Sequence, residues 1–394
     1  MSLFHQLRFG FAGRLAAFYA AVFVLMGVQL PFLPVWLKAK GLDANLIGIA
    51  LAAPMVARLV SVPLATRAAD RHDALRAALR LTGLACIMGY ALMALAPGPA
   101  SVIATYTLVS LAFTPVMPLA DTYALKGLAA QGRIYGPVRL WGSAAFIAGT
   151  FAAGLASDAL PAIELIWLIV AASFGLAFAA LLLAPLPGPA THIPATSAER
   201  RHLLRDPPFL AVLAAAALIQ ASHAVYYGFS SLAWRADGLS GSAIAALWAL
   251  GVFAEIVLFA CQGRLSAFIS PTGLLMAGAL GAVVRWGGMA LDPPAYVLPL
   301  LQVLHALSFG ATHLGAIGFI ARHAPPGQSA TAQGYLAIAL GIAMAASMAL
   351  AGWLYGAFGS AAYGAMVLAA VVGGGCALIA QRMRAREQAA MPVA

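Results

Sequence analysis

The sequence predicts an all-α integral membrane protein in which twelve transmembrane helices form two pseudo-symmetric six-helix bundles. The composition is the first observation: 63% of the 394 residues are hydrophobic and 9% are charged, with a mean hydropathy of +0.93. A chain with so little polar surface cannot cover a water-soluble globule, so it belongs in a bilayer. The other two observations are a series of long apolar segments and one long polar interval near the middle of the chain.

The predicted helices follow from the lengths of the apolar segments. A helix needs roughly 20 apolar residues to cross a bilayer, and prolines, glycines and charged clusters divide the sequence into twelve segments of about that length. Their approximate limits are 15–37, 44–66, 75–96, 100–125, 135–156, 161–184, 208–233, 241–262, 271–291, 295–321, 329–355 and 359–381.

A polar interval at 186–206 separates the sixth predicted span from the seventh. We therefore expect an N-terminal six-helix bundle at 1–185, a cytoplasmic linker at 186–206 and a C-terminal six-helix bundle at 207–394. Residues 36–42 also align with residues 233–239, a match short enough to arise by chance. Two six-helix repeats joined by a linker are a transporter architecture, with the substrate site at the repeat interface.

The basic residues predict the orientation in the membrane. Twelve spans leave both termini on one side, and sixteen lysines and arginines fall on that side, against Lys38, Lys40 and Arg235 on the other. The sixteen are Arg8, Arg14, Arg67, Arg71, Arg76, Arg80, Lys126, Arg133, Arg200, Arg201, Arg205, Arg264, Arg322, Arg382, Arg384 and Arg386. Since basic loops stay in the cytoplasm, both termini are expected there.

Composition and motifs also argue against several classes of function. The net charge of +10 does not indicate nucleic-acid binding, because the basic residues form short clusters between apolar runs. Cys86, Cys261 and Cys376 fall in different apolar segments without disulfide or metal spacing, so no metal or cofactor is expected. The first apolar run is longer than the core of a signal peptide, and we expect the first helix to be retained.

The stretch 110–146 places an acid and a base inside predicted spans. Asp121 lies near the end of one apolar segment, and Arg139 lies near the start of the next, after a short polar break. A charge at membrane depth is costly unless it is paired or faces water. Helices on either side of a tight break are antiparallel neighbours, so Asp121 and Arg139 can meet. They would form either the edge of a substrate cavity or a structural pair that clamps the two helices.

Further polar residues mark faces of other spans. Arg58, Glu255 and Arg285 complete the intramembrane charges, although the side chain of Arg58 can also reach toward the interface. Helical spacing places Glu255 on one face with Trp248. Two other spans carry polar stripes: Gln220, His223 and Tyr227 on one, and His305, Ser308 and Thr312 on the other, with His313 beside them. Tyr19 and Gln29 of the first span are candidate cavity-wall residues. Each histidine is either a hydrogen-bonding residue between helices or a proton carrier.

Several motifs resemble those of a known transporter family. They are Leu30 to Phe32 with Trp36 to Lys38, Pro118 to Asp121, Tyr135 and Gly136 with Val138 to Ser143, His223 and Ala224 with Tyr226 to Ser230, and Val284 to Gly287. On these motifs the chain resembles the 3-phenylpropionic acid permeases of the major facilitator superfamily, near the proton-coupled oligosaccharide and nucleoside symporters. The loop at 66–73 resembles a degraded superfamily motif, which implies that Asp70 and Arg71 latch helix ends. An ordinary charged turn is the alternative.

The resemblance implies roles for the intramembrane residues. In the more distant lactose permeases, the residues that match Asp121 and Arg139 bind sugar, and those that match Glu255, Arg285 and His305 belong to the coupling site. Gln302 and Ser308 depart from that pattern, so the proton mechanism cannot be carried over. The expected substrate-binding residues are Asp121, Arg139, Trp141, Arg58, Arg285, Tyr19, Gln29, His223, Tyr227 and Trp248, and the expected proton-coupling residues are Glu255, His305 and His313.

We therefore expect a major facilitator fold and proton-coupled uptake of a small aromatic monocarboxylate, such as 3-phenylpropionate, by alternating access. Intramembrane arginines can bind the anion, and nearby Trp and Tyr rings can cover its apolar ring. A proton symporter for a sugar or nucleoside is the alternative. An intramembrane enzyme using His305 or His313 is less favoured, because no acid stands at ligand spacing from either and no hydrolase or nucleotide-binding motif is present. The expected setting is a monomer in a bacterial inner membrane.

Glu255 is expected to carry the coupled proton, with Arg58 or Arg285 holding its charge when it is ionised. A symporter needs a titratable group within reach of the charge of its substrate, and burial makes a carboxyl gain a proton more readily. Asp121 is expected nearer the cytoplasmic end and ionised beside Arg139. His305 is the second candidate, since an imidazole titrates near neutrality.

Overall fold

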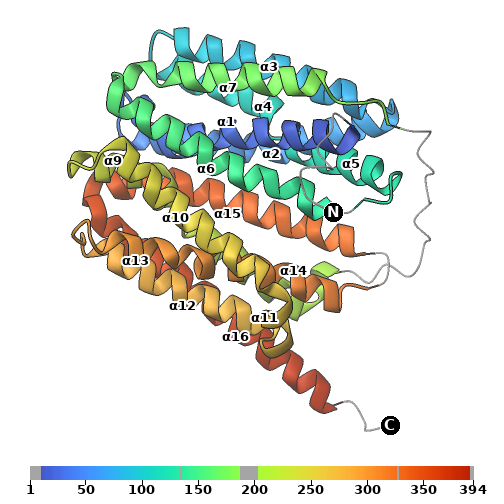
Figure 1. The fold of residues 1–394 in the computed structure, drawn as a ribbon. Helices are drawn as coiled ribbons and strands as arrows, with labels where there is room; N and C mark the ends of the chain where they lie inside the picture. The colour runs from blue at the N-terminus through green and yellow to red at the C-terminus, as the bar shows by residue number, and fades with distance from the viewer. Residues whose placement is uncertain (1–9, 134, 187–202, 326–327, 391–394) are drawn as a thin grey trace. The chain divides into compact units, whose positions relative to one another are not determined.

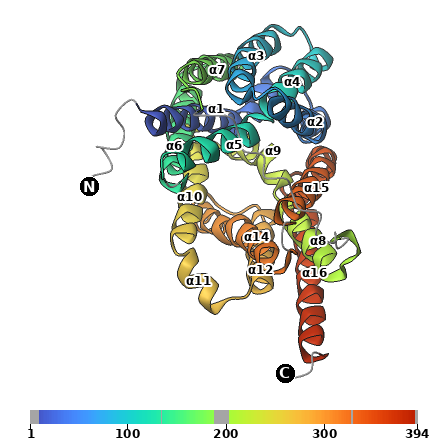
Figure 2. The same ribbon diagram turned by 90° about the vertical axis from the view of Figure 1, so that its right-hand side faces the viewer.

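The computed structural model describes residues 10–133, 135–186, 203–325 and 328–390. Within these ranges every regular element is helical, as Figures 1 and 2 show. The α-helices are α1 (Phe11–Ala39), α2 (Ala44–Arg71), α3 (Leu75–Leu95), α4 (Pro99–Phe113), α5 (Val116–Ala129), α6 (Tyr135–Ala159), α7 (Ile166–Leu181), α8 (Pro207–Ala221), α9 (Ala224–Ala236), α10 (Gly241–Ala260), α11 (Gln262–Phe268), α12 (Pro271–Ala290), α13 (Leu298–Val303), α14 (Thr312–His323), α15 (Ser329–Phe358) and α16 (Tyr363–Ala390). The predicted all-α class is confirmed.

Eleven helical stretches in the described residues are long and apolar enough to cross a membrane. The last of them, Thr331–Arg386, takes in both α15 and α16, which the sequence predicts as separate spans. Each of the other ten stretches overlaps one predicted span. Counting α15 and α16 separately gives the twelve spans that the sequence predicts.

Three predicted spans are each interrupted partway along their length. The fourth consists of α4 and α5, which meet at Thr114 and Pro115, where proline removes a backbone N–H. The seventh consists of α8 and α9, which meet at Ser222 and His223. The tenth consists of α13 and α14 with a π-helical turn, Ala306–Ala311, between them. Irregular backbone at membrane depth is tolerated where it is buried in protein or lines a cavity, so these breaks locate candidate sites.

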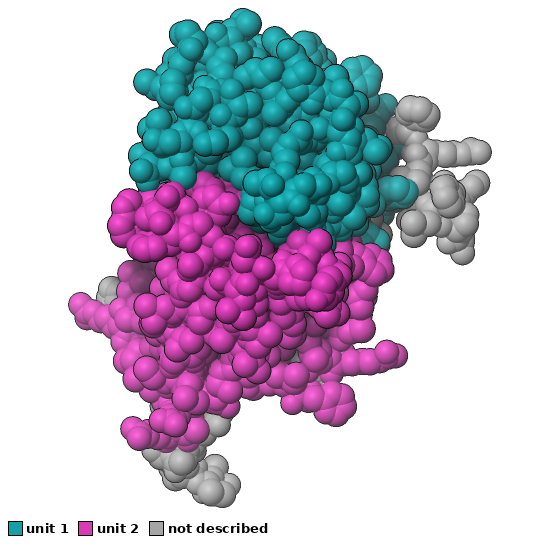
Figure 3. All heavy atoms as spheres, turned by 90° about the vertical axis from the view of Figure 1, so that its left-hand side faces the viewer, with its two compact units in different colours: residues 1–192, 230–249 teal, residues 193–229, 250–394 magenta. Residues whose placement is uncertain are grey.

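The chain forms two compact units, coloured separately in Figure 3. Unit 1 contains residues 1–192 and 230–249, and unit 2 contains residues 193–229 and 250–394. Helix α10 therefore contributes Trp248 to unit 1 and Glu255 to unit 2. Most of the predicted linker at 186–206 lies outside the described residues, and the division into bundles 1–185 and 207–394 stays a prediction.

Unit 1 is built around α1, which packs closely along α6. A Cβ atom added to Gly27 would lie 2.3 Å from the backbone oxygen of Phe146, and one added to Gly149 would lie 2.6 Å from the oxygen of Val24. Thr150 also donates a hydrogen bond to the Gly27 oxygen across this contact, at 3.1 Å. Small residues at such a crossing let two helix backbones approach, which is how helices associate in lipid.

Unit 2 has an apolar core between α8, α14, α15 and α16. Its buried members include Phe209, Leu213, Phe319 and Leu336, with Leu275 from α12. Helix α12 packs along α16 and against the π turn at Ala306–Ala311. The core thus holds α12 and the π turn next to each other, and these two elements carry Arg285 and Ser308.

Candidate functional site

A fully buried arginine lies at the centre of the polar cluster of unit 2. Arg285 of α12 is 0% exposed. Its Nη2 donates to Gln302 Oε1 at 2.7 Å, and its Nη1 lies 2.9 Å from His305 Nδ1 and donates to Ser308 Oγ at 3.3 Å. The guanidinium also lies 4.4 Å from the ring centre of Tyr226 and 4.6 Å from that of Trp286. All five partners are uncharged in this arrangement, so the cation is held by neutral groups.

The contact with Arg285 determines the tautomer of His305. An arginine can only donate, so Nδ1 of His305 must accept, and the ring proton is on Nε2. Nε2 lies 3.7 Å from Glu255 Oε2, too far for a hydrogen bond but close enough for electrostatic attraction. His305 therefore stands between the base Arg285 and the acid Glu255.

The hydrogen-bond partners of His223 determine its tautomer in the same way. Its Nδ1 lies 3.0 Å from the backbone oxygen of Gln220, which can only accept, so the proton is on Nδ1. Its Nε2 then accepts from the Ser308 hydroxyl at 3.1 Å. Ser308 thereby connects His223 to Arg285, and the rings of Tyr227 and Trp286 pack on His223 at centroid distances of 5.5 and 5.0 Å.

Irregular backbone and glycines bring these residues together. His223 lies in the break between α8 and α9, His305 precedes the π turn, and Ser308 lies within that turn. A Cβ atom added to Gly278 of α12 would lie 2.1 Å from Thr312 Oγ1, and one added to Gly281 would lie 2.5 Å from Leu307 Cβ. The two glycines therefore let the π turn approach α12. Single π turns of this kind are frequent at functional sites.

Two donors of this cluster lack an acceptor in the described residues. They are Nε of Arg285 and Nε2 of Gln302, both buried and without a hydrogen-bond partner there. Buried N–H groups are nearly always paired, so such an exception calls for an explanation. An anionic ligand would supply the missing acceptors.

Unit 1 has its own polar cluster around Asp121 of α5. Tyr19 of α1 and Tyr135 of α6 both donate to Asp121 Oδ1, at 2.6 and 2.7 Å. The guanidinium of Arg139 lies 4.1 Å from the ring centre of Phe23 and 5.6 Å from that of Tyr19. Asp121 and Arg139 thus share Tyr19 but form no ion pair, which corrects the expected direct pairing. Two tyrosine hydroxyls satisfy the carboxylate, and aromatic faces hold the arginine.

A second network in unit 1 surrounds Gln29. Its Oε1 accepts from Tyr90 Oη at 2.7 Å, and its Nε2 donates to Tyr106 Oη at 2.8 Å. The network links α1, α3 and α4. Gln29 therefore joins three helices in the described structure.

The remaining predicted residues differ in exposure and in their contacts. Arg58 is exposed on α2, Trp141 is half-buried on α6, and Trp248 is buried and donates to Ser231 Oγ at 3.1 Å within unit 1. His313 is exposed and packs against the rings of Phe259 and Phe309, and Phe309 also stacks on His305. Arg71 is exposed at the end of α2, and the side chain of Asp70 lies outside the described part of the chain, so the expected latch stays a prediction.

Sequence reasoning did not assign a role to several members of these clusters. Tyr90 and Tyr106 were missed, and Tyr135, Tyr226 and Trp286 were recognised only as parts of motifs. Gln302 and Ser308 were noted as departures from a pattern, yet both bind Arg285. A buried Tyr or Trp usually finds a hydrogen-bond partner, so aromatic residues with a polar atom inside the spans were the signal that could have found them.

Comparison with known proteins places this arrangement among transporters. Residues 13–364 match the model of the MFS_1 like family. The chain is 34% identical over 369 residues to a probable 3-phenylpropionic acid transporter of Escherichia coli K12, covering 91% of this chain and 94% of that protein. It is 30% identical over 328 residues to a maltose permease of Geobacillus stearothermophilus, covering 80% of each.

Solved structures show the same fold. The nucleoside transporter NupG superposes with a TM-score of 0.81 at 16% identity, over 95% of this chain and 99% of that one. The D-xylose-proton symporter superposes with a TM-score of 0.68 at 15% identity, over 92% of this chain and 97% of that one.

Proposed function

We propose, from the premise that the chain belongs to the MFS_1 like family of secondary transporters, that it takes up a small aromatic monocarboxylate together with a proton by alternating access. Members of this family are multi-pass membrane proteins that move small molecules and are not enzymes. The substrate class and the coupled proton are our proposal, and the unit 2 cluster around Arg285 is the observation that supports them.

The chemistry of this cluster suits a carboxylate attached to an aromatic ring. Among the described residues, neither the Nε–H of the buried Arg285 nor the amide Nε2 of Gln302, whose Oε1 accepts from Arg285, has a hydrogen-bond acceptor. A carboxylate can accept from both, and charge-assisted hydrogen bonds of this kind are the strong ones. The rings of Tyr226 and Trp286 pack on the guanidinium, so a carboxylate bound to Arg285 would have aromatic surroundings.

We propose that Glu255 carries the coupled proton and that His305 transmits the effect to Arg285. When Glu255 is ionised, its negative charge offsets the positive charge of Arg285 on the other side of the His305 ring. A proton on Glu255 removes this offset, and the substrate carboxylate then becomes the favoured counter-ion. Proton and substrate each strengthen the binding of the other, which linkage requires of a symporter. His305 stays the second candidate for the proton.

The setting in the cell is also proposed. The relative in Escherichia coli, described as a probable 3-phenylpropionic acid transporter, supports a bacterial setting and this substrate class, and we propose the inner membrane. The distribution of basic residues supports cytoplasmic termini. We propose a monomer of two six-helix bundles, at 1–185 and 207–394, with Asp70 and Arg71 as a cytoplasmic latch.

Uptake into proteoliposomes tests the proposal. Labelled 3-phenylpropionate is expected to accumulate when the outside is more acidic than the inside, and to equilibrate without accumulation when the gradient is collapsed. The uncharged analogue 3-phenylpropanol should not compete, because it cannot replace the carboxylate. Gradient-independent uptake would refute the coupling, and equal competition by the alcohol would refute recognition of the anion by Arg285.

The unit 1 clusters favour a second candidate, a proton symporter for a sugar or nucleoside. Asp121 with Tyr19 and Tyr135, and Gln29 with two further tyrosines, present the groups that hydrogen-bond hydroxyls. The maltose permease relative points the same way. Gradient-driven uptake of labelled maltose or uridine, with none of 3-phenylpropionate, would establish this candidate instead.

A further inference from the structure

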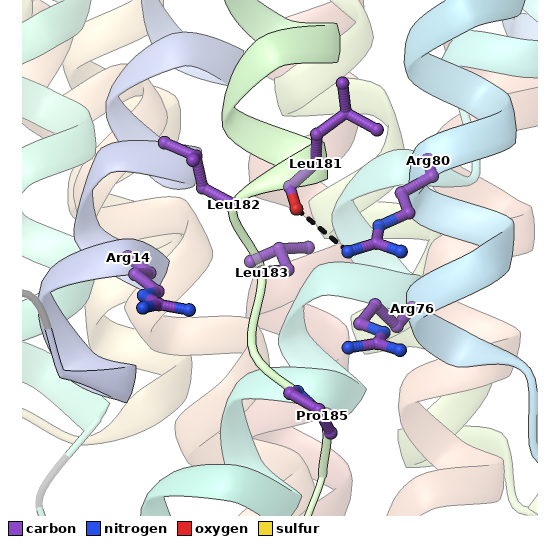
Figure 4. Close-up of a pocket in the computed structure, with 7 residues that line it drawn as sticks. All are labelled: Arg14, Arg76, Arg80, Leu181, Leu182, Leu183 and Pro185. Carbon is purple, nitrogen blue, oxygen red and sulfur yellow. Dashed lines mark hydrogen bonds between the residues drawn. The ribbon is translucent and has the colours of Figure 1, made fainter.

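Three arginines meet in a cavity at the ends of α1, α3 and α7 in unit 1. The cavity has a volume of about 310 Å³. Its lining residues are Arg14, Arg76, Arg80, Leu181, Leu182, Leu183 and Pro185. Figure 4 shows the guanidinium groups pointing toward the segment that follows α7, Arg14 from one side and Arg76 and Arg80 from the other. None of these seven described lining residues is acidic, so the cavity wall is positively charged.

The segment between the arginines is fixed by hydrogen bonds. Arg80 donates from Nη2 to the Leu181 oxygen at 2.8 Å and from Nε to the Ala180 oxygen at 3.3 Å, which satisfies carbonyls at the end of α7. The Tyr123 hydroxyl donates to the Ala184 oxygen at 2.6 Å. A guanidinium has five N–H donors, so these two bonds leave further donors on Arg80, which lines the cavity. The site is therefore formed before any ligand binds.

The position and chemistry of the cavity suit a phosphate group. Arg14 is exposed, and Arg76 and Arg80 are half-buried, so an anion can reach all three. Planar guanidinium groups match the oxygens of a phosphate better than an ammonium does. All three residues also belong to the side that the basic residues predict to be cytoplasmic, and anionic lipids are present in that leaflet.

An apolar stripe on α7 begins at the same cavity. Leu181, Phe178 and Phe174 follow helical spacing on one face of α7 and are 53%, 64% and 58% exposed. In a membrane such a face contacts lipid tails. We propose that the cavity binds the phosphate of an anionic phospholipid, with an acyl chain along this stripe. A free phosphate ion would use the same arginines but not the stripe.

The full chain in detergent provides the test. Native mass spectrometry with equal amounts of phosphatidylglycerol and phosphatidylcholine is expected to show one preferred phosphatidylglycerol adduct. An arginine near the membrane surface contributes about 1 kcal/mol to the binding of anionic lipid, or roughly a fivefold change in affinity. The double variant Arg14→Gln with Arg76→Gln should therefore bind about 25-fold more weakly. It keeps Arg80, whose bonds hold the end of α7.

A control variant separates the cavity from general charge. Arg133→Gln with Arg264→Gln removes the same charge at two exposed arginines that do not line the cavity, and it should keep the adduct. The proposal would be overturned if the two double variants lost the same affinity for phosphatidylglycerol, or if the cavity variant lost none. Displacement of the lipid by equimolar inorganic phosphate would also overturn it, because the site would then take the free ion. An unchanged thermal unfolding temperature of the cavity variant would show that its weaker lipid binding does not come from misfolding.

Discussion

At the scale of single residues, the environment of Arg285 carries the proposal that the protein binds a carboxylate. Transfer of an ion from water into a protein interior costs several kcal/mol unless other groups replace its hydration. Here three side-chain hydrogen bonds and two aromatic faces replace part of it, and Nε is left without a partner in the described residues. We therefore expect a bound carboxylate to stabilise the charge of Arg285 more than it would stabilise that of an exposed arginine.

Replacement of Arg285 by lysine tests this at constant charge. Lysine lacks the planar fork that reaches Gln302 and Ser308 together, and a hydrogen bond to a charged group contributes about 1.5–3 kcal/mol. We expect Arg285→Lys to lower kcat/KM for 3-phenylpropionate roughly 10- to 100-fold. The matched change Arg58→Lys, at an exposed position of α2, should leave it nearly unchanged. Equal effects of the two changes in the same uptake assay would show that Arg285 has no special role.

Replacement of Glu255 separates coupling from binding. Glutamine keeps the shape but cannot ionise, so Glu255→Gln should abolish accumulation driven by a pH gradient and retain exchange of substrate across the membrane. His305→Gln should weaken both, because it removes the ring between Glu255 and Arg285. Counterflow and gradient-driven uptake in the same vesicles measure the two activities. If accumulation survives in Glu255→Gln and fails in His305→Gln, the proton is carried by the histidine.

The sequence predicted the chemical types at the site better than their partners. Glu255, Arg285 and His305 were selected because ionisable groups inside spans are rare, and they do lie together. The partners of Asp121 were not predicted, because the position of Tyr19 against α5 depends on the packing of α1 with α6. Helical spacing also grouped Glu255 with Trp248, yet Trp248 binds Ser231 in unit 1. Periodicity gives the face of a helix and not the neighbour that covers it.

At the scale of elements, glycines set the distance between helices. The contact between α1 and α6 brings the Cα of Gly27 against the backbone at Phe146, with no room for a Cβ atom. Gly278 and Gly281 do the same between α12 and the π turn. The backbones that carry Tyr19 and Arg285 are positioned by such contacts.

A pair of glycine substitutions tests this role. Gly27→Ala places a methyl group 2.3 Å from a backbone oxygen that cannot move aside cheaply, so it should lower the free energy of unfolding by about 1–3 kcal/mol. Gly175→Ala on α7 meets nothing within 4 Å and should raise stability by up to about 1 kcal/mol through helix propensity. Unfolding of the purified protein in mixed micelles measures both. A Gly27→Ala variant as stable as Gly175→Ala would contradict the close contact.

The spans were predictable from the sequence, and the breaks within them were only partly so. Long apolar segments fix where a helix must cross, since backbone groups in lipid need internal hydrogen bonds. Pro115 signals the break between α4 and α5. No comparable residue signals the break after Ser222 or the π turn at Ala306–Ala311, because these depend on contacts with α12 that form only in the folded chain.

At the scale of the whole molecule, the orientation in the membrane is proposed from the distribution of basic residues alone, and it can be measured directly. We expect a C-terminal fusion to alkaline phosphatase to be inactive in cells and a C-terminal fusion to green fluorescent protein to be fluorescent, since both indicate a cytoplasmic C-terminus. A phosphatase fusion at the loop between α1 and α2, near Lys38 and Lys40, should be active. The reverse pattern would invert the topology and remove the argument for a cytoplasmic arginine cavity.

The opposite charges on the two sides of His305 have an electrical consequence. With Glu255 ionised and Arg285 charged, the empty cluster is neutral, and it is neutral again when a proton sits on Glu255 and a monocarboxylate anion sits on Arg285. One unbalanced charge crossing a 100 mV membrane potential would change the energy by about 2.3 kcal/mol, or roughly 50-fold in an equilibrium. A potassium diffusion potential imposed with valinomycin should therefore leave the accumulation of substrate unchanged, and only the pH difference across the membrane should drive it.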